Sequence, residues 1–423
     1  MANINVAQIE PGMVLADDLK DQNGRFLLAK GVELSAKHLK IMKTWGVVEA
    51  DIEGVTEQEI GEKQTADIDP KILEKAEEIE RQRFIFSDLE HEAVHQLFQI
   101  CVLRRARKIT VNPDLMKLKP SKTAPVSDEP TRSENSNGPK YDPKKIIRNK
   151  IKLPSLPTIF HKINEAINDP KCSATHIANI ISKDQSLSAR LLQLVNSAFY
   201  NFPSKIDTIS RAVAIIGTKQ LSTLSLGTCA LAVFKDVPSD LVNMKSFWKH
   251  SIACGIIARI LSSYKNNTLT ERFFVGGLLH DIGRLILFMS IPEISKEAVL
   301  RAKETGCMLN EAENDLIGFD HSKMGGILLK EWKLPISLEN IARFHHIKTE
   351  SQVQLDTAVA HIADVMANAL EIGNSGELNI PPLFPKAWTE IGLSPGIIAA
   401  TVDQAKHHID ETMQILFRNQ SEK

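Results

Sequence analysis

The sequence is poor in cysteine, and none of its cysteines has the CxxC spacing of many metal and redox sites. The five thiols are scattered along the chain: Cys101, Cys172, Cys229, Cys254 and Cys307. A scattered, odd-numbered set is typical of small apolar side chains buried in a reducing compartment. We therefore expect buried free thiols rather than a disulfide framework.

An excess of charge of either sign is also missing. Lys plus Arg number 51 and Asp plus Glu 52, so the chain has no general electrostatic attraction to nucleic acid or to an anionic membrane. No stretch reaches the roughly 18 uninterrupted apolar residues of a membrane span. Residues 1–18 have neither the basic nor the apolar segment of a secretory signal. These absences favour a cytoplasmic protein with no membrane or nucleic-acid partner.

The length predicts more than one domain, because 423 residues exceed an ordinary single core. Residues 116–143 are rich in Pro, Ser, Asn and charge and nearly devoid of apolar residues, so they cannot offset the entropy of ordering. The predicted parts are a small α+β accessory module (1–60), a helical connector (61–115), a flexible linker (116–147), a helical domain (148–416) and a disordered tail (417–423).

The first 60 residues predict a small mixed unit. Two apolar runs, 13–16 and 26–29, flank Asn23-Gly24, a dipeptide that suits a hairpin turn. Ser35 is a candidate N-cap for a following helix, and residues 47–52 form a last strand. Because it lacks clustered His, Cys or carboxylates, this unit is interpreted as a structural or sensory appendage. The apolar periodicity of residues 70–110 then predicts a helical pair, which could form a homodimer.

The remainder is predicted to be nearly all helix, so the fold class is mainly α. After helices beginning near Pro157 and Ser173 and one through 187–195, further helices are expected at 208–216, 218–233, 245–264, 271–279, 294–305, 321–332, 336–345, 353–370 and 394–416. Residues 173–196 resemble a helix-turn-helix. Positive charge is sparse on the second helix, which favours helix packing over DNA binding.

The helical region carries seven candidate metal ligands. They are His250, His280, Asp281, His321, His345, His346 and Asp364. Each lies on or beside a helix with apolar periodicity, so the side chains could project inward from facing helices. Imidazoles and carboxylates without thiolates favour Fe, Mn, Zn or Ni. No HExxH spacing is present, and spacing alone therefore does not decide between a metal site and separate structural roles.

Each candidate also has a structural interpretation. His250 could be a hydrogen-bonded core histidine, and His321 follows Asp320, a natural N-cap. The paired histidines at 345 and 346 would complement a helix dipole, and Asp364 could pair with His361 on its own helix. The adjacent His280-Asp281 after an apolar run is harder to explain this way, because burying both groups is costly without compensation.

Ordered motifs across 148–416 resemble the HDOD family, the HD-related output domain of bacterial signalling proteins. They comprise Leu153-Pro154-Ser155-Leu156-Pro157, residues 184–197 (DQSLSARLLQLVNS), residues 209–217 (ISRAVAIIG), His280-Asp281-Ile282-Gly283, residues 318–335 and His345-His346. Residues 1–55 are similar, less closely, to small N-terminal modules of HD-type signalling proteins.

The resemblance implies an all-helical fold related to HD phosphohydrolases. In those enzymes a His, a His-Asp pair and a distant Asp hold the metal, which correspond here to His250, His280-Asp281 and Asp364. In the HD-GYP cyclic-di-GMP phosphodiesterases, further ligands fall at the positions of His321, His345 and His346. The resemblance thus implies that this chain could retain a divalent metal.

Two departures from the HD-GYP pattern argue against catalysis. Arg284 replaces the lysine that follows His-Asp-Ile-Gly there, and no Gly-Tyr-Pro element follows His346. Arginine is not a conservative replacement where lysine transfers a proton. The favoured hypothesis is a non-catalytic regulatory module that binds a signalling protein or a nucleotide, with a link to cyclic-dinucleotide signalling. The alternative is a metal-dependent phosphohydrolase in which Asp281 orients hydroxide and Arg284 holds a phosphate.

Overall fold

A computed structural model describes residues 2–417 except for 7–8, 21–25, 45–46, 48, 55–66, 118–140, 148–155, 170, 201, 203, 235–236, 239–240 and 266–268. The predicted turn at Asn23-Gly24, most of the 116–147 linker and nearly all of the 417–423 tail lie outside these residues. The described chain forms two compact units. One comprises 1–121, 264–266 and 392–404, and the other 122–263, 267–391 and 405–423.

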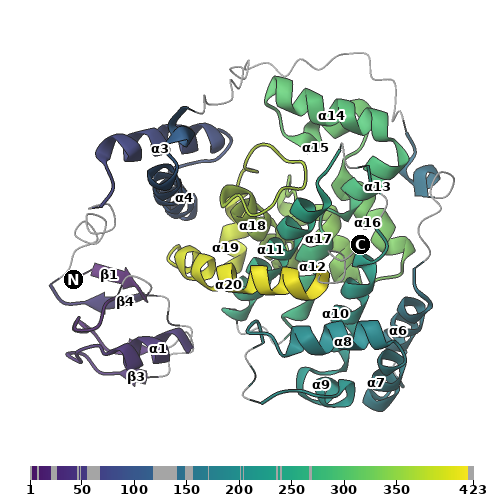
Figure 1. The fold of residues 1–423 in the computed structure, drawn as a ribbon, viewed down its shortest axis with the longest axis horizontal. Coiled ribbons are helices and arrows are strands. Elements are labelled where there is room, and N and C mark those ends of the chain that lie inside the picture. The colour runs from purple at the N-terminus through teal and green to yellow at the C-terminus, as the bar shows by residue number, and fades with distance from the viewer. Residues whose placement is uncertain are drawn as a thin grey trace. The chain divides into compact units, whose positions relative to one another are not determined.

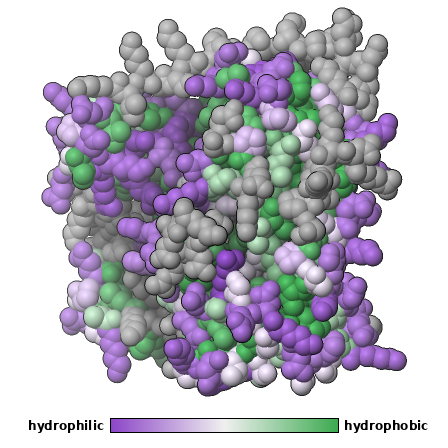
Figure 2. Space-filling model, turned by 45° about the vertical axis from the view of Figure 1, so that its right-hand side comes forward, coloured by the Kyte–Doolittle hydropathy of each residue, from purple (hydrophilic) through white to green (hydrophobic). Residues whose placement is uncertain are grey.

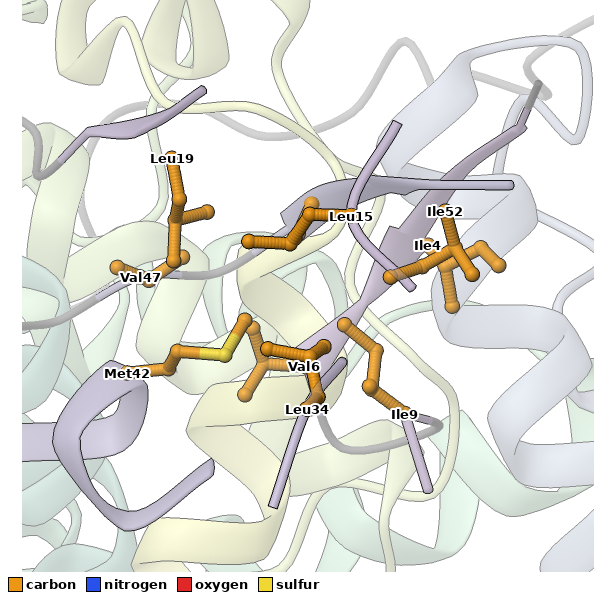
Figure 3. Packing of buried hydrophobic residues seen from close by; sticks show 10 residues of the cluster. Ile4, Val6, Ile9, Leu15, Leu19, Leu34, Met42, Val47 and Ile52 are labelled. Carbon is orange, nitrogen blue, oxygen red and sulfur yellow. The ribbon is translucent and has the colours of Figure 1, made fainter. Parts of the chain in front are cut away.

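The fold is mainly α with a small α+β N-terminal module, as predicted. In this module β1 (Ala2–Asn5) pairs antiparallel with β4 (Glu49–Ile52), and β2 (Leu19–Lys20) with β3 (Phe26–Leu28). Helix α1 (Ala36–Thr44) begins after Ser35, whose Oγ accepts from the His38 amide. Figure 3 shows the apolar side chains that fill this module, which are Ile4, Val6, Ile9, Leu15, Leu19, Leu34, Met42, Val47, Ala50 and Ile52.

The strand prediction for residues 13–16 was wrong in its pairing. The partner of β3 is β2 at Leu19–Lys20, while Val14 and Leu15 form isolated bridges to Glu33 and Ile52. Leu15 is fully buried, so its apolar run reflects core packing rather than a hairpin strand.

The predicted helical pair is present. It consists of α3 (Pro70–Arg83) and α4 (Glu92–Val111), followed by the 3-10 turn η2 (Pro113–Lys117). The buried Glu80 carboxylate receives Arg83 Nη1 at 2.6 Å and Arg105 Nε at 2.7 Å. This ion-pair triad ties α3 to α4.

The second unit is helical (Figure 1). Its helices, with the long C-terminal helix, are α5 (Pro143–Lys145), α6 (Thr158–Asn168), α7 (Ala174–Ser182), α8 (Gln185–Val195), α9 (Ile209–Ile216), α10 (Thr218–Leu231), α11 (Met244–Ser263), α12 (Glu271–Leu279), α13 (Ile282–Ser290), α14 (Pro292–Thr305), α15 (Leu309–Ile317), α16 (His321–Glu331), α17 (Ile336–Phe344), η4 (Glu350–Gln352), α18 (Leu355–Ala369), α19 (Pro385–Ile391) and α20 (Ile397–Phe417).

Four of these α-helices were not predicted: α5, which falls in the predicted linker, and α13, α15 and α19. Helix α13 is buried almost all round, so it lacks the alternation of apolar and polar faces on which a helix prediction depends. Residues 271–290, which span α12 and α13, form a segment long and apolar enough to cross a membrane. However, 89% of its most apolar 18-residue stretch is buried within the fold. Core packing accounts for their apolar character.

Glycines let the helices around His280-Asp281 approach closely. A Cβ on Gly277 of α12 would lie 2.6 Å from the Gly255 nitrogen of α11, and one on Gly283 of α13 would lie 2.0 Å from the His321 carbonyl oxygen of α16. Only glycine permits these backbone contacts. They bring α11 and α16 against the segment that carries His280 and Asp281.

Substituting Gly283 with alanine should destabilise the domain, because the rigid backbone of α16 must move to accept the methyl group. The expected loss is about 1–3 kcal/mol, the usual cost of overpacking, measured by chemical denaturation. Gly325→Ala is the matched control, since its Cβ would meet nothing closer than 3.4 Å. Equal stability of the two variants would contradict this account of the close contact.

Candidate metal centre

All seven predicted ligands come together in the interior of the second unit. His250 lies on α11, His280 and Asp281 form the turn between α12 and α13, His321 begins α16, His345 and His346 follow α17, and Asp364 lies on α18. Their exposed fractions run from 0% to 9%, with His346 the most exposed. Segments more than a hundred residues apart thus meet at one buried point.

One half of the cluster surrounds Asp364. Its Oδ1 lies 3.1 Å from His250 Nε2 and 3.6 Å from His280 Nε2. Oδ2 of Asp281 lies 3.2 Å from His280 Nε2 and 3.8 Å from His250 Nε2. Asn368 Nδ2 donates to Asp364 Oδ1 at 2.8 Å and orients that carboxylate.

The other half surrounds the second oxygen of Asp281. Its Oδ1 lies 3.2 Å from His321 Nε2 and 3.5 Å from His345 Nε2. His346 Nε2 lies 3.0 Å from His321 Nε2. Asp281 therefore stands between the two halves, with one carboxylate oxygen turned to each.

The histidines are oriented by hydrogen bonds on the far side of their rings. Nδ1 lies 2.7 Å from the Gly277 carbonyl in His280, 2.9 Å from the Ala342 carbonyl in His345, and 2.6 Å from Glu313 Oε2 in His321. These acceptors hold a proton on Nδ1, which turns the Nε2 lone pair toward Asp281. Metal-binding histidines are commonly held in this way.

Several atoms at the centre lack a hydrogen-bond partner within the described chain. They are His280 Nε2, His345 Nε2 and Asp281 Oδ1, all buried. A lone pair facing a carboxylate oxygen in the interior is repulsive unless a cation, either a proton or a metal, lies between them. Two ligands of one ion at about 2.1 Å lie at most about 4.2 Å apart, and the distances from His250 and His280 Nε2 to the Asp281 and Asp364 carboxylates are 3.1–3.8 Å. The residues fit a metal ion.

The charges point the same way. Burial lowers the pKa of His280, but Asp281 and Asp364 outweigh it and raise the value to about 10. Burial and Arg284 lower the pKa of His321, yet Glu313 and Asp281 raise it to about 9. Burial opposes ionisation of Asp281, but Arg284 and His280 hold its pKa well below the usual range. The cluster is rich in negative charge and attracts cations.

Arg284 adds a fixed positive charge to this centre. It is 1% exposed, with Nε 3.4 Å from Asp281 Oδ1 and Nη2 3.3 Å from His321 Nε2. On its other side Nη1 donates to Ser375 Oγ at 3.0 Å, and Nη2 lies 3.7 Å from Glu377 Oε2. Phosphate binding through Arg284, the role considered for it in an enzyme, would require it to leave these partners.

Four further side chains at this centre were not predicted from the sequence: Cys254, Glu313, Ser375 and Glu377. Cys254 was findable, because it follows His250 by four residues and so lies on the same helix face. Glu313, Ser375 and Glu377 come from helix α15 and the loop after α18, and no spacing links them to the ligands.

Of the structural roles predicted for single residues, the N-cap at Asp320 is present, and the local pair between Asp364 and His361 is not. Asp320 is an N-cap, since its Oδ1 accepts from the Lys323 amide at 3.0 Å. A local pair between Asp364 and His361 is wrong. His361 Nδ1 lies 2.8 Å from the His345 carbonyl, and its Nε2 accepts from the Phe384 amide at 3.0 Å. Asp364 instead faces His250.

Residues 153–348 match the family profile of the HDOD domain. The chain contains an HDOD domain. Asp364 lies beyond the matched residues, but helix α18 brings it back to His250. The HDOD resemblance inferred from the motifs is therefore confirmed.

Solved structures of HDOD-like proteins share the fold. An HDOD domain protein of Geobacter sulfurreducens is 22% identical, with a TM-score of 0.54 over 65% of this chain and 97% of that one. A candidate phosphohydrolase of Shewanella amazonensis is 23% identical, with a TM-score of 0.53 over 64% and 97%. At these identities the likeness establishes the fold alone.

An uncharacterised protein of Treponema pallidum is 27% identical over 195 residues, which is 46% of this chain and 37% of that protein. The similarity thus spans well under half of that relative's length.

Proposed function

We propose that the HDOD domain is a metal-binding regulatory module that does not hydrolyse phosphoesters. The observation that carries the proposal is the approach of His280 Nε2 and His345 Nε2, which have no hydrogen-bond partner among the described residues, to the buried carboxylates of Asp281 and Asp364. His250, His280, Asp281 and Asp364 would hold the ion, and its identity among Zn, Fe, Mn and Ni is part of the test. An ion there would tie α11, α12 and α18 together.

The closed surroundings favour a regulatory role over hydrolysis. His250, His280, Asp281 and Asp364 are each at most 3% exposed, whereas a hydrolytic site must admit a phosphoester and a water. Only residues 347–354 connect His345-His346 to α18. Lys348 in this connection pairs with Asp320 at 3.1 Å. This connection supplies no Gly-Tyr-Pro element to shape a substrate pocket.

Regulatory output would then pass through the surface of the domain. On the face of the molecule shown in Figure 2, hydrophobic side chains are interspersed among hydrophilic ones over the coloured part of the surface. The partner would be a signalling protein or a nucleotide, with a link to cyclic-dinucleotide signalling. The N-terminal module would receive or dock the input.

A metal-dependent phosphohydrolase is the competing function, because every ligand position of the HD pattern is filled. A bound divalent ion would lower the pKa of a coordinated water. In that role Asp281 would orient the attacking hydroxide, and Arg284 would have to exchange Glu377 for a phosphate.

Metal content and turnover together test the proposal. Protein purified without chelator should contain a divalent metal by elemental analysis, and re-addition after EDTA should raise the melting temperature. At 100 times Kd the gain is about 2.7 kcal/mol. His280→Ala should lose this response, while His176→Ala, which alters an exposed histidine on α7, should keep it.

The metal-loaded protein should not turn over cyclic-di-GMP or simple phosphodiesters. Absence of metal would overturn the metal centre, and turnover abolished by His280→Ala would establish the hydrolase instead.

Metal binding should tighten as pH rises. The ligand His280, with a pKa of about 10, carries a proton at neutral pH when only protein groups surround it, as does His321 outside the ligand set, with a pKa of about 9. An ion must displace the protons of its ligands. In metal-free protein the raised histidine pKa values stabilise the fold fully at a pH below the ordinary histidine pKa of about 6.5. This stabilisation is lost as the pH rises through the raised pKa values. Calorimetry in buffers of different ionisation enthalpy should detect proton release on loading, and an affinity independent of pH would contradict this.

A further inference from the structure

Cys254 lies within the half of the cluster that surrounds Asp364. It follows His250 by one helical turn on α11 and is 1% exposed. Its Sγ lies 3.5 Å from His250 Nε2 and 3.9 Å from Asp364 Oδ1. The thiol therefore faces the same point as two of the candidate ligands.

A second, independent observation comes from the facing helix. His280 Nε2 is buried, has no hydrogen-bond partner in the described part of the chain, and points into the same space. One ligand atom from each of His250, Cys254, His280 and Asp364 lies within 4.8 Å of every other. The close backbone contact at Gly277 holds α12 in this position against residues 254 and 255.

We infer that Cys254 is a thiolate ligand of the metal, completing a set with His250, His280 and Asp364. The inference rests on the proposed metal centre and changes its chemistry. On binding, the metal–sulfur bond forms and the thiol proton passes to solvent, with no change of oxidation state. For bonds of about 2.3 Å to sulfur and about 2.1 Å to nitrogen, a tetrahedral ion sets the two ligand atoms about 3.6 Å apart. The observed separation of Cys254 Sγ and His250 Nε2 is 3.5 Å.

A thiolate narrows the choice of metal. Soft sulfur ligands favour zinc and iron over magnesium or manganese, so the expectation of a thiolate-free site is revised. These four donors fill a tetrahedral shell, and Asp281 Oδ2 lies beside them, 3.2 Å from His280 Nε2. Closed ligand sets are typical of structural metal sites, whereas catalytic ones keep a position open for water. A thiolate ligand would thus give a chemical reason for the proposed lack of hydrolysis.

Cobalt substitution tests the inference directly. Wild-type protein loaded with Co²⁺ should show a near-ultraviolet sulfur-to-cobalt charge-transfer band. Cys254→Ser should lose the band. It should still bind Co²⁺, but with lower affinity than the wild type. Cys229→Ser, which alters another buried thiol on α10, should retain it. A band that survives Cys254→Ser would overturn the inference.

X-ray absorption of the zinc-loaded wild-type protein keeps the test independent of how the variants fold. A sulfur scatterer at about 2.3 Å is expected. A shell of nitrogen and oxygen only would overturn the thiolate and leave the proposed metal centre standing, with Cys254 then a weak S–H donor to Asp364. Failure of wild-type protein to bind zinc or cobalt would overturn both.

Discussion

Replacing Asp281 with asparagine is expected to abolish metal binding and to destabilise the HDOD domain by about 3–5 kcal/mol, the cost of breaking a buried ion pair. Its carboxylate stands 3.2 Å from both His280 and His321 and 3.4 Å from Arg284. A neutral amide removes the carboxylate that lies 3.4 Å from Arg284 Nε, so the guanidinium charge repels an incoming cation more strongly. Calorimetric titration and denaturation with and without zinc would measure the two losses.

Asp315→Asn is the matched control for this variant. Asp315 also pairs with an arginine, Arg301, at 3.2 Å, but its side chain is 62% exposed. Exposed pairs contribute about 0–1 kcal/mol, so its metal affinity and stability should stay close to those of the wild type. Wild-type affinity in Asp281→Asn would show that the carboxylate is not a ligand.

Replacing Arg284 with methionine should also cost about 3–5 kcal/mol in metal-free protein, because the buried carboxylates of Asp281 and Glu377 lose their cation. In the wild type Arg284 Nη2 lies 3.3 Å from His321 Nε2, so we expect its charge to keep a second divalent ion away from the His321, His345 and His346 half. Without it, this half can bind metal. The expected stoichiometry is one ion in the wild type and two in Arg284→Met, with much of the lost stability recovered at high metal concentration.

Arg284→Lys distinguishes the effect of the positive charge at this position from that of the guanidinium shape. Lysine keeps the positive charge but not the fork that spans Asp281, Ser375 and Glu377. It should therefore bind one ion and lose less stability than methionine. Two ions in the wild type, or one in Arg284→Met, would show that Arg284 does not set the stoichiometry.

Much of the candidate centre was predictable because its ligands belong to a motif. His280-Asp281 stood out as a costly buried pair after an apolar run, and the HDOD resemblance linked it to His250 and Asp364. No periodicity could show that Asp281 turns one oxygen to each half of the cluster. That arrangement depends on the approach of α16 at Gly283, which the sequence presents only as one more glycine.

The parts that could not be predicted are those set by tertiary contacts. Helix α13 has no polar face, so nothing in its pattern separates it from α12. Glu377 is an acidic residue in a loop, where exposure is the usual expectation, but it is buried beside Arg284. The spacing of four residues places Cys254 on the same helix face as His250, but the approach of its thiol to Asp364, which lies 110 positions further along the chain, becomes apparent only in the fold.

Anomalous diffraction at the zinc edge, from crystals of zinc-loaded protein, would locate the metal ion. We expect one peak per chain, enclosed by His250, Cys254, His280, Asp281 and Asp364, with no peak in the His321, His345 and His346 half. The absence of a peak among His250, Cys254, His280, Asp281 and Asp364 would contradict the metal centre. A second peak beside Arg284, with an open water position, would contradict the closed, non-hydrolytic site.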